Sequence, residues 1–168
     1  MRALQMTEKY LIKNYALFDR HFKAPLVENF DFKNKKQITT SQRGIYFLAF
    51  QIAQKKYAIY IGSTQNLKDR FDWYLGNFQP HAASDFKLMA FYQYTVTQKI
   101  TGIFSLHFKE CQALSKNELQ KKEQSFISAF SPLINGRINF KEDNRKLEVA
   151  YIDYFENIFY KKINNQNG

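Results

Sequence analysis

The chain has 168 residues, of which 45% are hydrophobic and 17% are aromatic, so it can bury a core and a disordered protein is excluded. Its formal net charge of +10 indicates a polyanionic partner. No apolar run approaches the roughly 20 residues of a membrane span, so nucleic acid is favoured over a basic membrane-facing surface. The single cysteine, Cys111, excludes an internal disulfide and a cysteine-cluster zinc site. The first fifteen residues lack the apolar stretch of a secretory signal, and we expect an intracellular protein.

The predicted elements are a helix, two strands, two helices, a strand and two further helices. Two helix starts are predicted from capping residues. Asn66 can cap a helix that has Asp69 at its third position, and Ser115 and Glu118 have the spacing of a capping box. This order predicts an α/β fold of the α+β type, with helices around a small, mostly antiparallel sheet. The elements are expected over residues 11–22, 45–50, 57–61, 65–78, 85–93, 102–111, 115–130 and 145–162.

The chain is expected to form one compact domain with extensions at both ends. Residues 1–43 carry the first helix and a basic arm, 44–140 form the core, and 141–168 form a C-terminal amphipathic helix. Within the first extension, residues 31–43 are polar and show no periodicity, so this stretch is interpreted as a connector or a docking arm.

Two tyrosines occupy equivalent places in the two paired strands. Alternation puts Tyr46 on the face opposite to Ile45 and Phe47, and it puts Tyr60 opposite to Ile59 and Ile61. Both tyrosines are therefore expected on the same side of the sheet, and Gly62 would let a backbone or a phosphate approach closely. The alternative is a cross-strand aromatic pair without a function, which contributes about 0.5–1.5 kcal/mol.

Two charged residues complete a possible site. Arg70 and Tyr74 are four residues apart and share one helical face, although Arg70 taken alone could be a solvated surface residue. Glu123 falls on the apolar stripe that includes Leu119 and Phe126, and an ionised carboxylate there is costly unless it is paired or binds a metal. A structural ion pair with Arg70 is the alternative.

Together these residues resemble the signature of the GIY-YIG nuclease family. The tripeptide GIY lies at 44–46 and YIG at 60–62, and Arg70 follows in the next helix, as in the family. The segment EQSFISAFSPLIN is similar to the family's glutamate-to-asparagine segment and matches at Glu123, Pro132 and Asn135. The resemblance covers residues 44–135 and implies a three-stranded antiparallel sheet flanked by helices.

The resemblance also implies a metal-dependent endonuclease that hydrolyses phosphodiester bonds in DNA. Glu123 would bind Mg²⁺ (or Mn²⁺), Arg70 would clamp a phosphate oxygen, and Tyr46 would be the general base beside Tyr60. We expect the metal, Arg70 or Lys56 to ease the deprotonation of Tyr46, and Asn135 to orient Glu123 or the backbone around it.

The chain departs from the family at one position. Many members carry histidine where this sequence has Tyr74, and we expect the tyrosine to be compatible with activity. His81 and His107 are candidates to replace the imidazole, although a lone histidine is more often structural.

Double-stranded DNA is the expected partner. The alternatives are a nuclease acting on single-stranded or structured nucleic acid, and a non-catalytic nucleic-acid-binding or ribosome-associated module. We expect the C-terminal helix to pack on the core or on a second subunit of a homodimer. The residues expected to contact backbone phosphates are Lys33, Lys35, Lys36 and Arg43.

Overall fold

The protein is a mixed α/β fold built around an antiparallel sheet of four strands. The computed structural model describes residues 4–6, 8–75, 83–97, 99–135 and 160–162. The strand order is β2-β5-β3-β4, so β3 is central and β4 lies at an edge. The strands are β2 (Pro25–Val27), β3 (Gly44–Ile52), β4 (Lys55–Thr64) and β5 (Ile103–Glu110).

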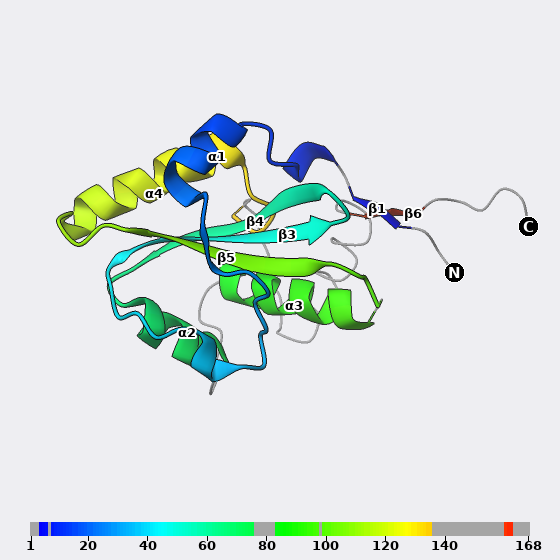
Figure 1. The fold of residues 1–168 in the computed structure, drawn as a ribbon, viewed down its shortest axis with the longest axis horizontal. Helices are drawn as coiled ribbons and strands as arrows, with labels where there is room; N and C mark the ends of the chain where they lie inside the picture. Colours follow the sequence, from blue (N-terminus) through cyan, green and yellow to red (C-terminus); the bar gives the residue numbers. More distant parts are fainter. Residues whose placement is uncertain (1–3, 7, 76–82, 98, 136–159, 163–168) are drawn as a thin grey trace, which may run out of the picture.

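Helices cover both faces of this sheet (Figure 1). On one face lie α1 (Tyr15–Phe22) and α4 (Lys116–Phe130), and on the other lie α2 (Leu67–Leu75) and α3 (Ala83–Thr97). Two short 3-10 helices, η1 (Glu8–Tyr10) and η2 (Lys35–Gln37), complete the helical elements. Among the described residues, none of the helices has both the length and the hydropathy needed to cross a membrane.

The central strand β3 is buried on both faces, because its successive side chains alternate between two hydrophobic cores, one on each side of the sheet. Ile45, Phe47 and Ala49 pack under α1 and α4, whereas Tyr46 and Leu48 pack under α2 and α3. The prediction that the two tyrosines share a face is confirmed. Leu48 lies on the same face of β3 as Tyr46 and pairs with Tyr60, and the centres of the two tyrosine rings are 5.8 Å apart. That face is a second core rather than an open surface, with Tyr46 only 1% exposed.

The sheet has one strand more than expected. Pro25 ends the first helix, as predicted, but it also begins β2, which pairs with β5. A strand of three residues is too short to show a period, which is why the sequence did not indicate it. The first helix starts later than predicted, at Tyr15, because the Asn14 side chain accepts the Leu17 N–H at 3.1 Å and caps it.

The two ends of the described chain pair with each other. Strand β1 (Leu4–Met6) is antiparallel to β6 (Tyr160–Lys162). The helix predicted over 145–162 is therefore wrong in its last three residues, which are extended, and residues 145–159 lie outside the described part. The helices and the strand expected over 65–78, 85–93, 102–111 and 115–130 are present as α2, α3, β5 and α4, with their ends shifted by a few residues in α2, α3 and β5.

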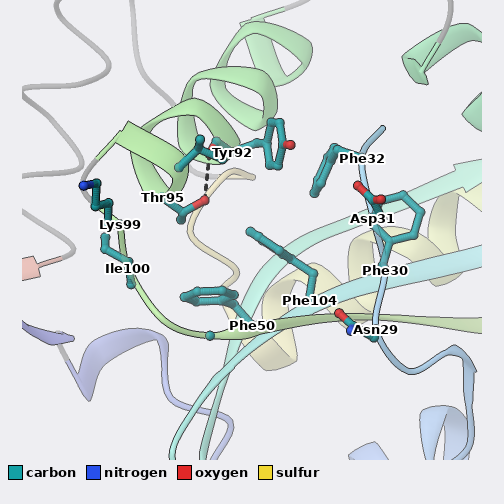
Figure 2. Close-up of a pocket in the computed structure, with 12 residues that line it drawn as sticks. Asn29, Phe30, Asp31, Phe32, Phe50, Tyr92, Thr95, Lys99, Ile100 and Phe104 are labelled. Carbon is teal, nitrogen blue, oxygen red and sulfur yellow. Dashed lines mark hydrogen bonds between the residues drawn. The ribbon is translucent and has the colours of Figure 1, made fainter. Parts of the chain in front are cut away.

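The polar segment before β3 is a connector that packs against the core. Phe30, Phe32 and Ile38 are buried, and the Phe32 ring stacks on Tyr92 of α3 with the ring centres 4.5 Å apart. Figure 2 shows these rings beside Phe104 of β5, at the wall of a cavity of about 420 Å³. The aromatic residues of the connector thus fix its course across α3, and Lys33 and Lys36 are exposed.

The edge strand β4 is covered along its length by backbone that is not part of the sheet. The Ile12 N–H donates to the Lys56 carbonyl at 3.0 Å, and the N–H groups of Leu133 and Ile134 donate to Ala58 and Ile59. This pairing satisfies an edge that would otherwise be open to another strand. It also fixes the position of β4, which matters because its end carries the candidate site.

His107 is a structural residue of the core under α1. Its Nδ1–H donates to the Phe22 carbonyl at 2.5 Å, so Nε2 is left to accept from the Ser105 hydroxyl at 3.0 Å. The ring also packs edge-on against Phe18. Burial lowers the pKa of His107 from 6.5 to about 4, helped by the charge of Lys56. The expectation that His107 replaces a catalytic imidazole is wrong, because it lies on the opposite face from Tyr46.

This burial predicts an acid-sensitive stability. In the unfolded chain His107 takes up a proton near pH 6.5, whereas in the native protein it stays neutral until about pH 4. The free energy of unfolding therefore falls as the pH drops between these values. We expect a loss of about 3 kcal/mol from this residue over that window, measured by urea unfolding at several pH values. In His107→Gln the free energy of unfolding should fall less steeply over the same window, and an equal slope would contradict the assignment.

Candidate functional site

The site starts from a close contact between Tyr46 and Gly62, which pair across β3 and β4. A Cβ atom built on Gly62 would lie closer than 3.0 Å to the Tyr46 Oη and Cζ atoms. The space that glycine leaves is therefore filled by the phenol, whereas the sequence suggested the close approach of a backbone or a phosphate. The contact holds the Tyr46 hydroxyl at the end of β4, where the sheet meets α2.

Arg70 reaches this hydroxyl from the second turn of α2. The helix start is anchored by the connector, because the Leu67 and Lys68 N–H groups donate to the Gln42 and Thr40 carbonyls at 3.2 and 3.0 Å. The predicted cap is also present, with Asn66 Oδ1 accepting the Asp69 N–H at 3.0 Å. Held in this way, Arg70 Nε donates to Tyr46 Oη at 3.5 Å.

Glu123 approaches the same strand end from the other face. It projects from α4, and its Oε2 atom accepts a hydrogen bond from the hydroxyl of Ser63. Burial raises the pKa of Glu123, while the Ser63 hydrogen bond and the charge of Arg70 oppose this shift. The carboxylate also borders a polar hollow along α4, lined by Asn117, Gln120, Lys121 and Gln124. Glu123 is therefore a half-buried acid with access to solvent.

Ser63 was not identified from the sequence. It follows YIG directly, and alternation along β4 turns it to the face opposite to Gly62. The feature that could have indicated Ser63 is its position at the end of the strand, directly after Gly62, which contacts Tyr46 on the other face.

Asn135 fixes the strand just before the site. Its Oδ1 accepts the Ile61 N–H at 2.9 Å, and its Nδ2 donates to the Ile61 carbonyl at 2.7 Å. Of the two roles expected for Asn135, the structure places it on the backbone and not on Glu123. The side chain imitates a paired strand and keeps Gly62 and Ser63 in position.

Lys56 lies away from the tyrosines, contrary to expectation. Its Nζ atom is 5.4 Å from the centre of the Phe18 ring, on the face covered by α1. The cause is a β-bulge, since Leu48 pairs with Tyr60 and Ala49 with Ala58, which leaves Ile59 as an extra residue. Ile59 therefore belongs to the same core as Tyr60, and the prediction that it lies on the opposite face is wrong. Counting by twos from Tyr60 therefore gives the wrong face for Lys56.

The basic arm divides into two parts. Arg43 serves the fold, because its Nη1 atom donates to the Leu114 carbonyl at 2.5 Å, just before α4 begins. Lys33 and Lys36 are exposed on the connector next to α2, and Lys35 lies in η2. The side chains of Lys35 and Tyr74 fall outside the described part, as does the whole of His81.

The chemistry of the site fits a sparsely liganded Mg²⁺ or Mn²⁺ ion. In the described part of the chain, no group of three or more His, Cys, Asp or Glu side chains could hold a metal ion. Magnesium, however, keeps several waters and often takes one or two carboxylates together with substrate oxygens. A half-buried carboxylate with a raised pKa is a group that a bound cation would stabilise in its ionised form.

Comparison of the chain with protein-family models, with curated proteins and with solved structures found no match in any of the three. The function proposed below therefore rests on the residues and their geometry.

The Tyr46–Gly62 contact predicts a specific pattern of stability. Gly62→Ala should destabilise the protein by about 1–3 kcal/mol, because the new methyl group collides with the phenol. In a Tyr46→Ala background the same substitution should cost much less, since the space is then free. The measurement is a double-mutant cycle by urea unfolding. Additive effects of the two changes would show that the two residues do not compete for this space.

Proposed function

We propose that this protein is a metal-dependent endonuclease of the GIY-YIG type that hydrolyses phosphodiester bonds in DNA. The observation that carries the proposal is the convergence of Tyr46, Arg70 and Glu123 on the end of β4, although 77 residues separate the first from the last. Tyr60 packs beside Tyr46 in the same group. A phenol, a guanidinium and a carboxylate could supply the base, the phosphate-binding group and the metal ligand for hydrolysis of a phosphate diester.

Each residue has a role that follows from its surroundings. The Arg70 guanidinium donates to Tyr46 Oη and would stabilise the phenolate, which can then take a proton from water as the water oxygen attacks phosphorus. The other donors of the same guanidinium could bind a non-bridging phosphate oxygen. Glu123 and Ser63 would hold Mg²⁺ or Mn²⁺, which when bound offsets charge on the phosphate and on the leaving oxygen.

The surface around the site supports a polyanionic substrate. The chain carries a net charge of +10, and Lys33 and Lys36 are exposed beside α2, the helix that carries Arg70. We propose that they contact backbone phosphates on that side, with Lys35 of the same arm. Asn117, Gln120, Lys121 and Gln124 offer polar contacts beside Glu123 on the α4 side.

The first test separates a catalytic Glu123 from a structural one. Glu123→Gln should lower the rate of plasmid cleavage in Mg²⁺ by about 10²–10³-fold or more, because the amide cannot replace the carboxylate charge. The free energy of unfolding at pH 7 should be unchanged or slightly higher, since burial already disfavours the ionised form.

Glu110→Gln is the matched control, because Glu110 is exposed at the same end of the sheet and should tolerate the change. The alternative, in which Glu123 belongs to a buried ion pair, predicts a loss of about 3–5 kcal/mol in stability. That loss, in a protein whose wild type shows no metal-dependent cleavage of plasmid, single-stranded DNA or RNA, would refute the proposal.

The second test concerns the general base. Tyr46→Phe should reduce the cleavage rate by about 10²–10⁴-fold, because it removes the hydroxyl that takes the proton from water. Tyr57→Phe removes a hydroxyl from an equally buried ring at the far end of β4, where Tyr57 pairs with Phe50, and should leave the rate nearly unchanged. Single-turnover kinetics of both variants provide the measurement. Equal rates for the two would assign the base to another group.

A further inference from the structure

A cluster of basic side chains lies on the sheet face opposite to Tyr46. It consists of Arg20 and His21 at the end of α1, Lys109 in β5 and Lys122 in α4, and is called the basic cluster below. Helices α1 and α4 lie on the same side of the sheet (Figure 1), and an aromatic core joins them, with the ring centres of Phe22 and Phe126 5.0 Å apart. None of these four residues has a role in the site described above.

The geometry of neighbouring residues shows that the cluster is compact. The His21 ring lies 5.0 Å from the Phe126 ring, and Lys122 is one helical turn before Phe126 on the same side of α4. Lys109 pairs with Ile45 and points to this face, two residues beyond His107. In agreement, burial and then the charges of Lys109, Arg20 and Lys122 lower the pKa of His21.

No member of the basic cluster forms an ion pair in the described part of the chain. Among the described residues the ion pairs are Lys55–Glu8 and Lys68–Asp72, and neither includes a member of the basic cluster. In the same part of the chain, His21 Nδ1 is buried and has no hydrogen-bond partner. Glu110, the nearest acid along β5, is exposed. Like charges at close range are unfavourable, so an anion bound among them would be stabilised.

The position of the basic cluster relative to Glu123 indicates which anion it would bind. Lys122 and Glu123 are consecutive in α4 and so point about 100° apart, on opposite flanks of the stripe formed by Leu119, Phe126 and Phe130. A helix with its side chains is about 10 Å across. Two side chains that point 100° apart on it are about 8 Å from each other, and at 3.4 Å per base pair this is about two steps along a nucleic-acid strand.

We infer that the basic cluster binds backbone phosphates of a DNA duplex that crosses α4 and presents its scissile phosphate at Glu123. The inference rests on the proposed function for the identity of the substrate. It assigns the duplex a second set of contacts, on the face opposite to the lysines of the connector. Arg20, Lys109 and Lys122 supply permanent charges, and His21 supplies a ring N–H or lone pair among them.

The test compares two triple variants, each of which loses three positive charges, but at different places on the surface. In the first, Arg20→Gln, Lys109→Gln and Lys122→Gln are combined. In the control, Lys13→Gln, Lys55→Gln and Lys99→Gln are combined, because these residues are exposed around the opposite end of the sheet, near the β3–β4 turn. Binding of a duplex of about 30 base pairs is measured by fluorescence anisotropy, with Ca²⁺ replacing Mg²⁺, from 50 to 300 mM salt.

The cluster variant should weaken binding by at least about tenfold at 0.1 M salt. It should also flatten the plot of log affinity against log salt by about 2–3 units, since each lost phosphate contact removes about 0.9. The control variant should change the slope by less than one unit. In Mg²⁺, KM should rise while kcat stays near the wild-type value, because these contacts bind substrate and transition state equally.

Two results distinguish this inference from the proposed function. Wild-type cleavage together with equal salt slopes for the two variants would overturn the inference and leave the nuclease proposal standing. If the wild type binds the duplex but cleaves nothing in Mg²⁺, and the slope falls only in the cluster variant, the inference holds and the enzymatic proposal fails.

Discussion

The phenol ring of Tyr46 lies against the backbone of Gly62, and the arrangement of the site depends on this contact. No other residue type leaves room for the ring at that place, because even a single methyl group would overlap the hydroxyl. The contact places the Tyr46 hydroxyl beside Gly62, near the end of β4. Only there can the guanidinium of α2 reach it, which is why the tyrosine and the arginine meet despite their separation in the chain.

The end of β4 joins the two halves of the site because its side chains alternate between the faces. Gly62 turns toward Tyr46 and α2, while Ser63 turns toward Glu123 and α4. One strand thus separates the phenol from the carboxylate and holds both at its end. Asn135 and the backbone of Leu133 and Ile134 restrain this edge strand from outside, so a site made of two halves has one rigid support.

The helices bring charge to a sheet whose two faces are almost entirely apolar. Both cores are rich in aromatic rings, which leaves the strand ends and the helix flanks as the places where polar groups can remain hydrated. Helix α4 shows the consequence most clearly, because its buried stripe is bordered by an acid on one flank and a lysine on the other.

The sequence by itself determined the longer elements from α1 to α4, since the caps at Asn66 and Ser115 and the apolar periods are local signals. It also determined that Tyr46 and Tyr60 share a face and that Glu123 stands out on an apolar stripe. The tertiary structure decided the rest. The bulge at Ile59 moved Lys56 to the other face, and three-residue strands formed where no period could show. The partner of Glu123, the burial of His107 and the gathering of Arg20, Lys109 and Lys122 depend on packing between distant segments, which local patterns do not encode.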